Sequence, residues 1–334
     1  MATINASLPT LQDLVSRTKP GGGIDQIVEI LGQRNAVLQD MPWREGNLTT
    51  GHQYTSRKSL PSGTWRRMNE GVAPTKSRTD QVTETCGMLD AMSKVDCAPV
   101  DLNSGGDAAS GAAFRASEDS AFMQGLSNDL ETAIFYSSTK TDPEKILGFS
   151  PRLDSTTGLW GGQIVDSQIA AAGSDQASMW CIGWGAGYAY GIYPKGTTAG
   201  LTSFDGGRQL TTDSGGTNQF WAYVTSWSWK VGLCIEDARA VVRLANIDTS
   251  AIAETGSLLI QDMVKMVAQC RAPGAKKVIY TNQRIATYLN LQALDSTKNS
   301  TLKIENIGGE NVTSFLGIPV RVTDALTNTE AIIT

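Results

Sequence analysis

Residues 191–198, GIYPKGTT, have the residue types of a phosphate-binding loop: two glycines five positions apart, with a lysine and threonines beside them. In a loop that cradles phosphates, the lysine directly follows the second glycine, so that its ammonium reaches the phosphates while backbone N–H groups surround them. Here Lys195 precedes Gly196, and Pro194 removes one N–H donor. We therefore interpret the segment as a turn that leaves a strand, and not as a nucleotide site.

The chain has one histidine, His52, so any pairing of a histidine with a serine or cysteine nucleophile depends on it. Neither a Gly-x-Ser-x-Gly elbow nor a reactive-cysteine signature accompanies it, and we expect an exposed histidine without a special role. One imidazole excludes a histidine-rich metal centre, and the acidic residues are not gathered into ligand pairs. We expect no catalytic residue, no cofactor and no metal. A hydrolase with a carboxylate pair stays open, because such carboxylates meet only in space.

An aromatic row offers a different chemistry. Trp221, Tyr223, Trp227 and Trp229 share one face of a strand predicted in WAYVTSWSWKVGLCI, because even spacings lie on one face. Such a row could stack sugars or unpaired bases, which makes a carbohydrate-binding or carbohydrate-active protein the alternative function. We favour a core or subunit-interface role, since neither basic residues nor paired amides interleave the rings.

Composition limits the function classes. The 334 residues are 40% hydrophobic and 18% charged, enough for two domains that each bury a core. The net charge of −5 gives no overall attraction to nucleic acid. Five cysteines at irregular intervals favour reduced thiols over a disulfide framework or a zinc site. With no secretory leader and no long apolar run, we expect a reducing, cytosol-like compartment and no membrane contact.

The segment 53–80 differs from the rest of the chain. It carries six basic residues against Glu70 and Asp80, a net charge of +4, so the remainder of a chain whose total is −5 carries −9. Its few large apolar residues predict a two-stranded ribbon that cannot bury a core alone. A cationic ribbon on an anionic body favours contact with another copy of that body. A solvated hairpin and a phosphate-contacting, nucleic-acid-binding patch are the alternatives.

We expect seven residues of this segment at an inter-subunit contact: Arg57, Lys58, Trp65, Arg66, Arg67, Lys76 and Arg78.

The longest predicted element is a helix over 112–137, where Phe122, Leu126, Leu130 and Ile134 recur every four residues. Such a helix runs roughly 35–40 Å, a spine more than an ordinary packing helix. The other expected elements are a polar head ending at 19–23, a helix from Ile24 closed by Pro42, strands over 81–96 (irregular at Gly87), 178–184, 188–193, 221–235 and 276–282, a helix over 257–269, a short helix to about Leu291, and a terminal sheet over 302–326.

This order of parts resembles the major capsid proteins of tailed bacteriophages, particularly short-tailed phages. Six sequence segments resemble that family and occur in the same order: VEILGQRNAVLQDMPWREGN (28–47), TWRRMNEGVAPTKS (64–77), DPEKILGFSPR (142–152), GIYPKG (191–196), VVRLANID (241–248) and FLGIPVRVTD (315–324). The match spans nearly the whole chain.

The resemblance implies the α+β fold of tailed-phage capsid proteins. It divides the chain into an N-terminal arm (1–45), an extended β-ribbon loop (46–80) laid over a neighbouring subunit, a peripheral domain with the long spine helix (81–154), an α/β axial domain (155–300) around the five-fold and quasi-six-fold axes, and C-terminal strands of the peripheral domain (301–334).

The resemblance also implies a non-enzymatic subunit that self-assembles, as pentamers and hexamers, into the icosahedral shell of a phage head. The subunit would assemble in the host cytoplasm, pass through a procapsid and end in the virion capsid. Implied partners are a separate scaffolding protein, since no long N-terminal scaffolding segment is present, a portal protein, a decoration or cement protein, and non-specifically held double-stranded DNA on the inner face. Some members join neighbours by lysine–asparagine bonds. Lys58 and Lys76 lie in the corresponding loop, but we do not expect crosslinks, because other subunits must supply the asparagine and a carboxylate.

Overall fold

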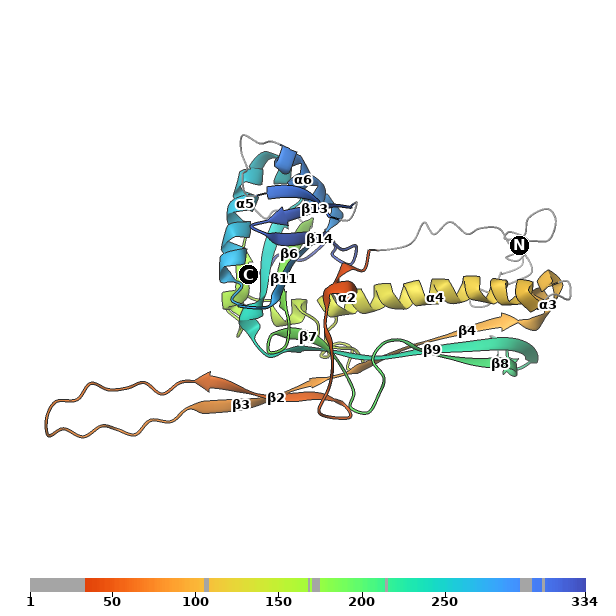
Figure 1. Ribbon diagram of the computed structural model, residues 1–334, viewed down its shortest axis with the longest axis horizontal. Coiled ribbons are helices and arrows are strands. Elements are labelled where there is room, and N and C mark those ends of the chain that lie inside the picture. Colours follow the sequence, from red (N-terminus) through yellow and green to blue (C-terminus); the bar gives the residue numbers. More distant parts are fainter. Residues whose placement is uncertain are drawn as a thin grey trace.

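The computed structural model describes residues 34–104, 108–167, 169, 175–213, 216–294, 302–307 and 310–334. It has three visible parts: a rounded part of sheet and helices, an elongated part built on the longest helix, and a ribbon that projects away from both (Figure 1). This mixture confirms the expected α+β class. None of the helices in these residues is long and apolar enough to cross a membrane.

The rounded part is a mixed sheet with helices on one face. Strand β6 (Gln176–Trp184) is its centre, pairing antiparallel with β10 (Val241–Asp248) and β11 (Lys276–Thr281). The remaining elements of this part are β1 (Trp43–Glu45), β5 (Ile164–Asp166), β7 (Ala189–Tyr193), β12 (Leu302–Ile307), β13 (Glu310–Phe315), β14 (Ile318–Val322), α5 (Ile252–Gln269), α6 (Gln283–Leu294) and three single 3-10 turns, Ser150–Arg152, Gly161–Gln163 and Ala238–Ala240.

Every residue of β6 is buried, because both faces of the sheet are covered. Met179 and Cys181 point into the cluster that contains Leu259 of α5. The alternate residues Trp180 and Ile182 point the other way, into a second cluster that includes the C-terminal end of the long helix. A strand buried on both faces has a nearly continuous apolar sequence, without polar residues at every second position. This explains why the segment SMWCIGW does not alternate.

The elongated part consists of the long helix α4 (Ala108–Tyr136) lying along a three-stranded sheet of β4 (Gly87–Asp96), β9 (Gln219–Ile235) and β8 (Thr202–Thr212), with α3 (Cys97–Ser104) at its far end (Figure 1). The 29 residues of α4 give a length of about 43 Å. The helix begins four residues before the expected Ala112. Phe122 of α4 stacks on Trp227 of β9, with ring centroids 5.0 Å apart.

Two strands form the ribbon expected from segment 53–80. Strands β2 (Gly51–Ser59) and β3 (Arg78–Thr85) pair antiparallel as a separate two-stranded sheet. The residues between them, 60–77, belong to no helix or strand, and we call them the ribbon tip. The strand expected over 81–96 is interrupted at Cys86, so its first part lies in the ribbon and its second part, from Gly87, lies under α4.

The sheet topology differs from the expected division at residue 300. Strand β14 pairs parallel with β11, so the C-terminal strands belong to the rounded part and do not lie along the long helix. Conversely, β8 and most of β9 belong to the elongated part, although the chain enters them from the rounded part. Helix α5 also starts at Ile252, before the expected Ser257. Of the helix expected from Ile24, the described residues contain only α2 (Ala36–Asp40).

Candidate inter-subunit surface

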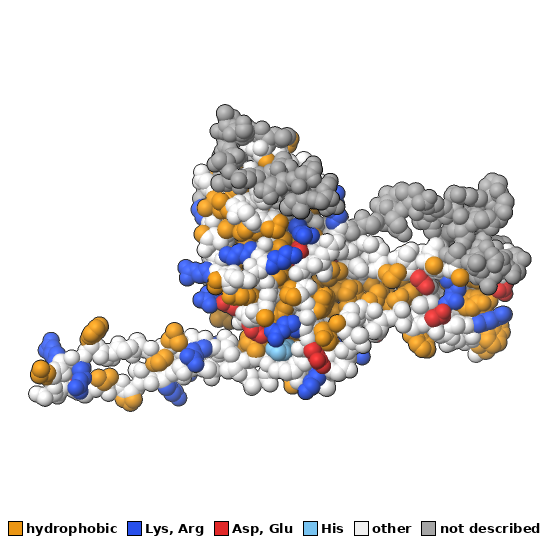
Figure 2. Space-filling view, viewed as in Figure 1, with side chains coloured by type: hydrophobic (Ala, Val, Ile, Leu, Met, Phe, Trp, Pro, Cys, Tyr) orange, Lys and Arg blue, Asp and Glu red, His pale blue; other side chains and the backbone are white. Residues whose placement is uncertain are grey.

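The ribbon tip is exposed along its whole length. Trp65 has 102% of its reference surface exposed, and Leu60 and Met68 are also largely exposed. Figure 2 shows hydrophobic side chains together with Lys and Arg side chains along the ribbon, separated by polar surface. Large apolar side chains that cover nothing on their own chain mark an interaction surface.

The seven predicted contact residues lie in one ribbon but not in one cluster. Arg57 and Lys58 lie on β2, Arg78 begins β3, and the other four, Trp65, Arg66, Arg67 and Lys76, lie in the tip. Lys58 forms an ion pair of 2.5 Å with Asp80 across the ribbon, and the hydrogen bond and charge of Lys58 lower the pKa of Asp80. Among the described residues, Arg66 donates to the backbone oxygen of Glu70 alone, at 3.2 Å. Lys58 therefore differs from the tip residues, because its charge is already paired.

The base of the ribbon is fixed to the body. The Tyr54 hydroxyl of β2 donates to the Ile235 carbonyl at 2.7 Å. On β3, the buried carboxylate of Glu84 accepts two hydrogen bonds of 2.7 Å from Arg152. Charge-assisted, two-pronged pairs of this kind hold a defined orientation. The ribbon therefore leaves the body in a set direction while its tip stays uncovered.

His52 departs from the expectation of an exposed residue. Its ring is half-buried at the ribbon base, 3.9 Å from a Glu236 oxygen and 6.1 Å from the Tyr190 ring. Ligand atoms of His52, Cys234 and Glu236 lie within 4.8 Å of one another, a donor set that zinc can use. However, the Tyr190 hydroxyl already donates to Glu236, and burial raises the pKa of Cys234 to about 12, which opposes thiolate formation. Because Glu236 is already hydrogen-bonded by Tyr190 and ionisation of the Cys234 thiol is disfavoured, the arrangement fits a structural support of the ribbon base better than a metal centre.

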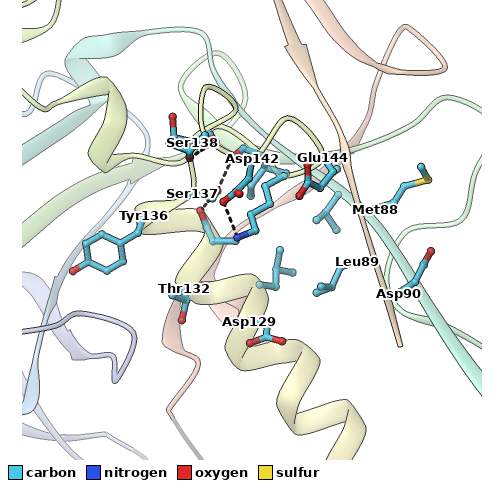
Figure 3. A pocket seen from close by; sticks show the side chains of 17 residues that line it. Met88, Leu89, Asp90, Asp129, Thr132, Tyr136, Ser137, Ser138, Asp142 and Glu144 are labelled. Atoms are coloured by element: carbon cyan, nitrogen blue, oxygen red, sulfur yellow. Dashed lines mark hydrogen bonds and ion pairs between the residues drawn. The ribbon is translucent and has the colours of Figure 1, made fainter. Parts of the chain in front are cut away.

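A groove lies where α4 ends and β4 begins. It encloses about 590 Å³ and is lined by α4, by the first residues of β4 and by the loop after α4. In Figure 3, Asp129 and Thr132 belong to the helix, Met88, Leu89 and Asp90 to the strand, and Asp142 and Glu144 to the loop. We call this feature the acidic groove, because four carboxylates line it against a single lysine: Asp90, Asp129, Asp142, Glu144 and Lys145.

Local contacts hold the wall of the acidic groove. The Ser137 hydroxyl lies 2.6 Å from the Ile146 carbonyl, which ties the loop to the helix end. Gly87 is required opposite, since a Cβ there would lie 2.9 Å from the Glu144 carbonyl oxygen. Sequence reasoning missed the groove because its residues come from three separate segments. The one available signal was the irregularity expected at Gly87.

The aromatic row does not form a sugar-stacking platform. Trp227 and Trp229 are buried, and Trp229 belongs to the same hydrophobic cluster as Trp180 and the C-terminal end of α4. Trp221 is half exposed with the Arg208 guanidinium 5.7 Å from its ring centroid. The predicted core role is therefore correct for Trp227 and Trp229, and the rings do not present a common open face.

A long helix on a narrow sheet, a separate rounded α/β part and a projecting two-stranded ribbon together define the capsid-protein fold of tailed phages. The structure is similar to that of bacteriophage Epsilon15, with a TM-score of 0.80, 34% identity, and coverage of 100% of this chain and 99% of that chain. It shares the fold of the bacteriophage JBD30 capsid, with a TM-score of 0.50, 10% identity, and coverage of 97% and 99%. No curated protein matches the chain.

The family model described as major capsid protein GP7 matches residues 19–334, and the chain belongs to this family. It is a structural subunit of a phage shell, located in the virion capsid, and it associates with copies of itself. The predicted family, fold class and shell-forming function are confirmed.

Proposed function

We propose that the ribbon tip is the segment that holds neighbouring copies together in the shell. The observation that carries this proposal is the complete exposure of Trp65 at the end of a ribbon anchored firmly at its base. An aromatic side chain buries about 150–250 Å² at a contact, and tryptophan and arginine dominate the energetics of interfaces. Trp65, Arg66 and Arg67 are consecutive in this tip.

The tip has little support from its own chain. Among the described residues, its hydrogen bonds are the Arg66 contact with Glu70 and a backbone bond from Glu70 to Arg67 at 3.3 Å. A segment with so few contacts gains order when it lies on a partner. Because the tip and its receiving surface are different parts of the molecule, the contact is head-to-tail and closes into a ring when the rotation permits. Pentamers and hexamers are such rings.

The same proposal covers the partners that a phage head requires. A scaffolding protein, a portal protein and a decoration or cement protein would contact the shell, and packaged double-stranded DNA would lie on its inner face without sequence preference. We further propose that the elongated part is the peripheral domain, that the rounded part is the axial domain, and that the subunit catalyses no reaction.

The test is charge reversal at the tip. We expect Arg66→Glu/Arg67→Glu to leave the fold intact, because both side chains are exposed, and to block or strongly weaken particle formation. Electron microscopy and sedimentation of protein expressed with its scaffold would measure this. The matched control is Arg271→Glu/Arg284→Glu, which reverses two exposed arginines on the rounded part and should assemble. Normal particles from the tip variant would show that the tip is not the contact.

A further inference from the structure

We infer that the acidic groove of one copy receives the ribbon tip of the next copy, with Trp65 in the apolar floor and Arg66 and Arg67 at the carboxylates. This inference rests on the proposed function of the tip and names its receiving surface. The partner is therefore a second copy of this chain, recognised through one aromatic ring and adjacent guanidinium groups.

The floor of the groove suits an aromatic side chain. Leu89, Leu130 and Ile146 line it, and the thioether of Met88 is 70% exposed at its edge. The volume of about 590 Å³ lies within the range of pockets that bury compact ligands, about 300–1,000 Å³. Methionine makes favourable sulfur contacts with aromatic rings. Leu130 and Ile146 are buried by their own chain, so the exposed apolar side chain that Trp65 would meet first is Met88, with the half-buried Leu89 beside it.

The charges are complementary. Asp142 is paired with Lys145 at 2.9 Å, whereas Asp90, Asp129 and Glu144 form no ion pair with any described residue. Asp129 and Glu144 are exposed at the rim. On the other side of the contact, Arg66 and Arg67 are exposed and bind no carboxylate of the described chain. Contact between the tip and the groove would therefore give Arg66 and Arg67 the carboxylate partners that they lack within the described chain.

The backbone offers a further contact. Strand β4 lies at the end of the strand order and, among the described strands, pairs with β9 alone. Its second edge therefore keeps donors and acceptors that an extended segment can use. The ribbon tip is such a segment, since residues 60–77 belong to no helix or strand.

The occupant must come from another molecule. In Figure 1 the ribbon runs away from the body, and its tip lies far from the end of α4 where the groove opens. The buried Glu84–Arg152 pair holds the base of the ribbon in this outward direction. The tip of a neighbouring copy is therefore the occupant that we infer for this groove.

Crosslinking between introduced cysteines tests the location. Ser62 lies in the tip near Trp65, and Thr132 is an exposed lining residue of the groove. We expect assembled Ser62→Cys/Thr132→Cys particles, treated with a short bismaleimide, to give a ladder of linked subunits on a denaturing gel. The matched control is Ser62→Cys/Ala116→Cys, whose helix position is exposed but about 24 Å along α4 from Thr132. The parent chain, with four buried cysteines and half-buried Cys86, sets the background.

The outcomes separate this inference from the proposed function. A ladder from the Thr132 pair alone supports the groove. No ladder from that pair, or a stronger ladder from the Ala116 pair, overturns the groove but leaves the tip as a contact if Arg66→Glu/Arg67→Glu still blocks assembly. Linkage of the tip to a scaffold or other protein in place of a second copy also overturns the groove.

A charge exchange tests the chemistry. We expect Asp129→Lys/Glu144→Lys to reduce particle yield, and its combination with Arg66→Glu/Arg67→Glu to raise the yield by about tenfold over either double variant. A combined variant that assembles no better than the worse double variant would overturn the pairing of these residues. Thermal unfolding of the unassembled variants would show that all of them fold.

Discussion

The guanidinium of Arg152 forms two hydrogen bonds of 2.7 Å to the carboxylate of Glu84, a residue 68 positions earlier in the chain. Both side chains are more than nine-tenths buried. Through this pair, the strand that carries the ribbon is held to the segment that follows the long helix. This buried ion pair on β3 and the Tyr54–Ile235 hydrogen bond on β2 together set the direction in which the ribbon leaves the subunit.

Removal of one partner of this pair should destabilise the fold. We expect Arg152→Ala to lower the free energy of unfolding by about 3–5 kcal/mol, because Glu84 would remain as a buried charge without a partner. Chemical denaturation of the unassembled subunit measures this. The double variant Glu84→Leu/Arg152→Met should lose less than Arg152→Ala, and an equal or greater loss would contradict the assignment of the cost to the unpaired charge.

Glu131 should make stability depend on pH. This buried residue of α4 accepts hydrogen bonds from the Val37 amide at 3.2 Å and from the Thr323 hydroxyl at 2.7 Å, while its other oxygen has no partner among the described residues. Burial raises its pKa from 4.5 to about 7, with a smaller contribution from Asp324 and opposing contributions from the two hydrogen bonds. The folded state thus holds a proton that the unfolded state releases above pH 4.5.

The resulting stabilisation is complete below pH 4.5 and is lost as the pH rises to about 7. We expect Glu131→Gln to flatten the pH dependence of the unfolding free energy across this window. Denaturation at a series of pH values measures it, with Asp154→Asn as a control at an exposed acid. If the unfolding free energies of the wild type and of Glu131→Gln change with pH in the same way across this window, this role of Glu131 is excluded.

Gly191 should tolerate no side chain. A Cβ at this position would lie 2.7 Å from the Trp43 ring, because β7 pairs directly with β1 there. We expect Gly191→Ala to cost about 1–3 kcal/mol, as overpacked core positions do. Gly196→Ala should cost about 1 kcal/mol for a different reason, since its φ of +79° is left-handed although the space is open. Gly162→Ala, with neither constraint, should have no measurable effect on thermal unfolding.

Trp65 should matter for assembly and not for folding. Because its side chain is fully exposed, we expect Trp65→Ala to leave the unfolding free energy of the subunit unchanged and to lower particle yield more than Leu60→Ala does. Denaturation and sedimentation measure the two quantities. A loss of subunit stability on this substitution would mean that the tip packs on its own chain.

Regular elements were predictable where a local pattern determines them. The four-residue spacing of Leu126, Leu130 and Ile134 predicted the long helix, and the run SMWCIGW predicted the central strand. The division placed at residue 300 is a different kind of prediction, because no local pattern determines it. Strands β12–β14 are locally alternating segments, and nothing in their pattern says whether they pair with β11 or lie beside α4.

By itself, the sequence determined that segment 53–80 is cationic and too polar to bury a core, and that the chain follows the order of a capsid subunit. Composition and periodicity are local properties, so they can be read from the sequence without knowing which residues are neighbours in space. Only the tertiary structure decided that His52 lies against Glu236, that Lys58 is already paired with Asp80, and that carboxylates of three separate segments surround one groove. Those relationships depend on long-range contacts, which a linear pattern does not encode residue by residue.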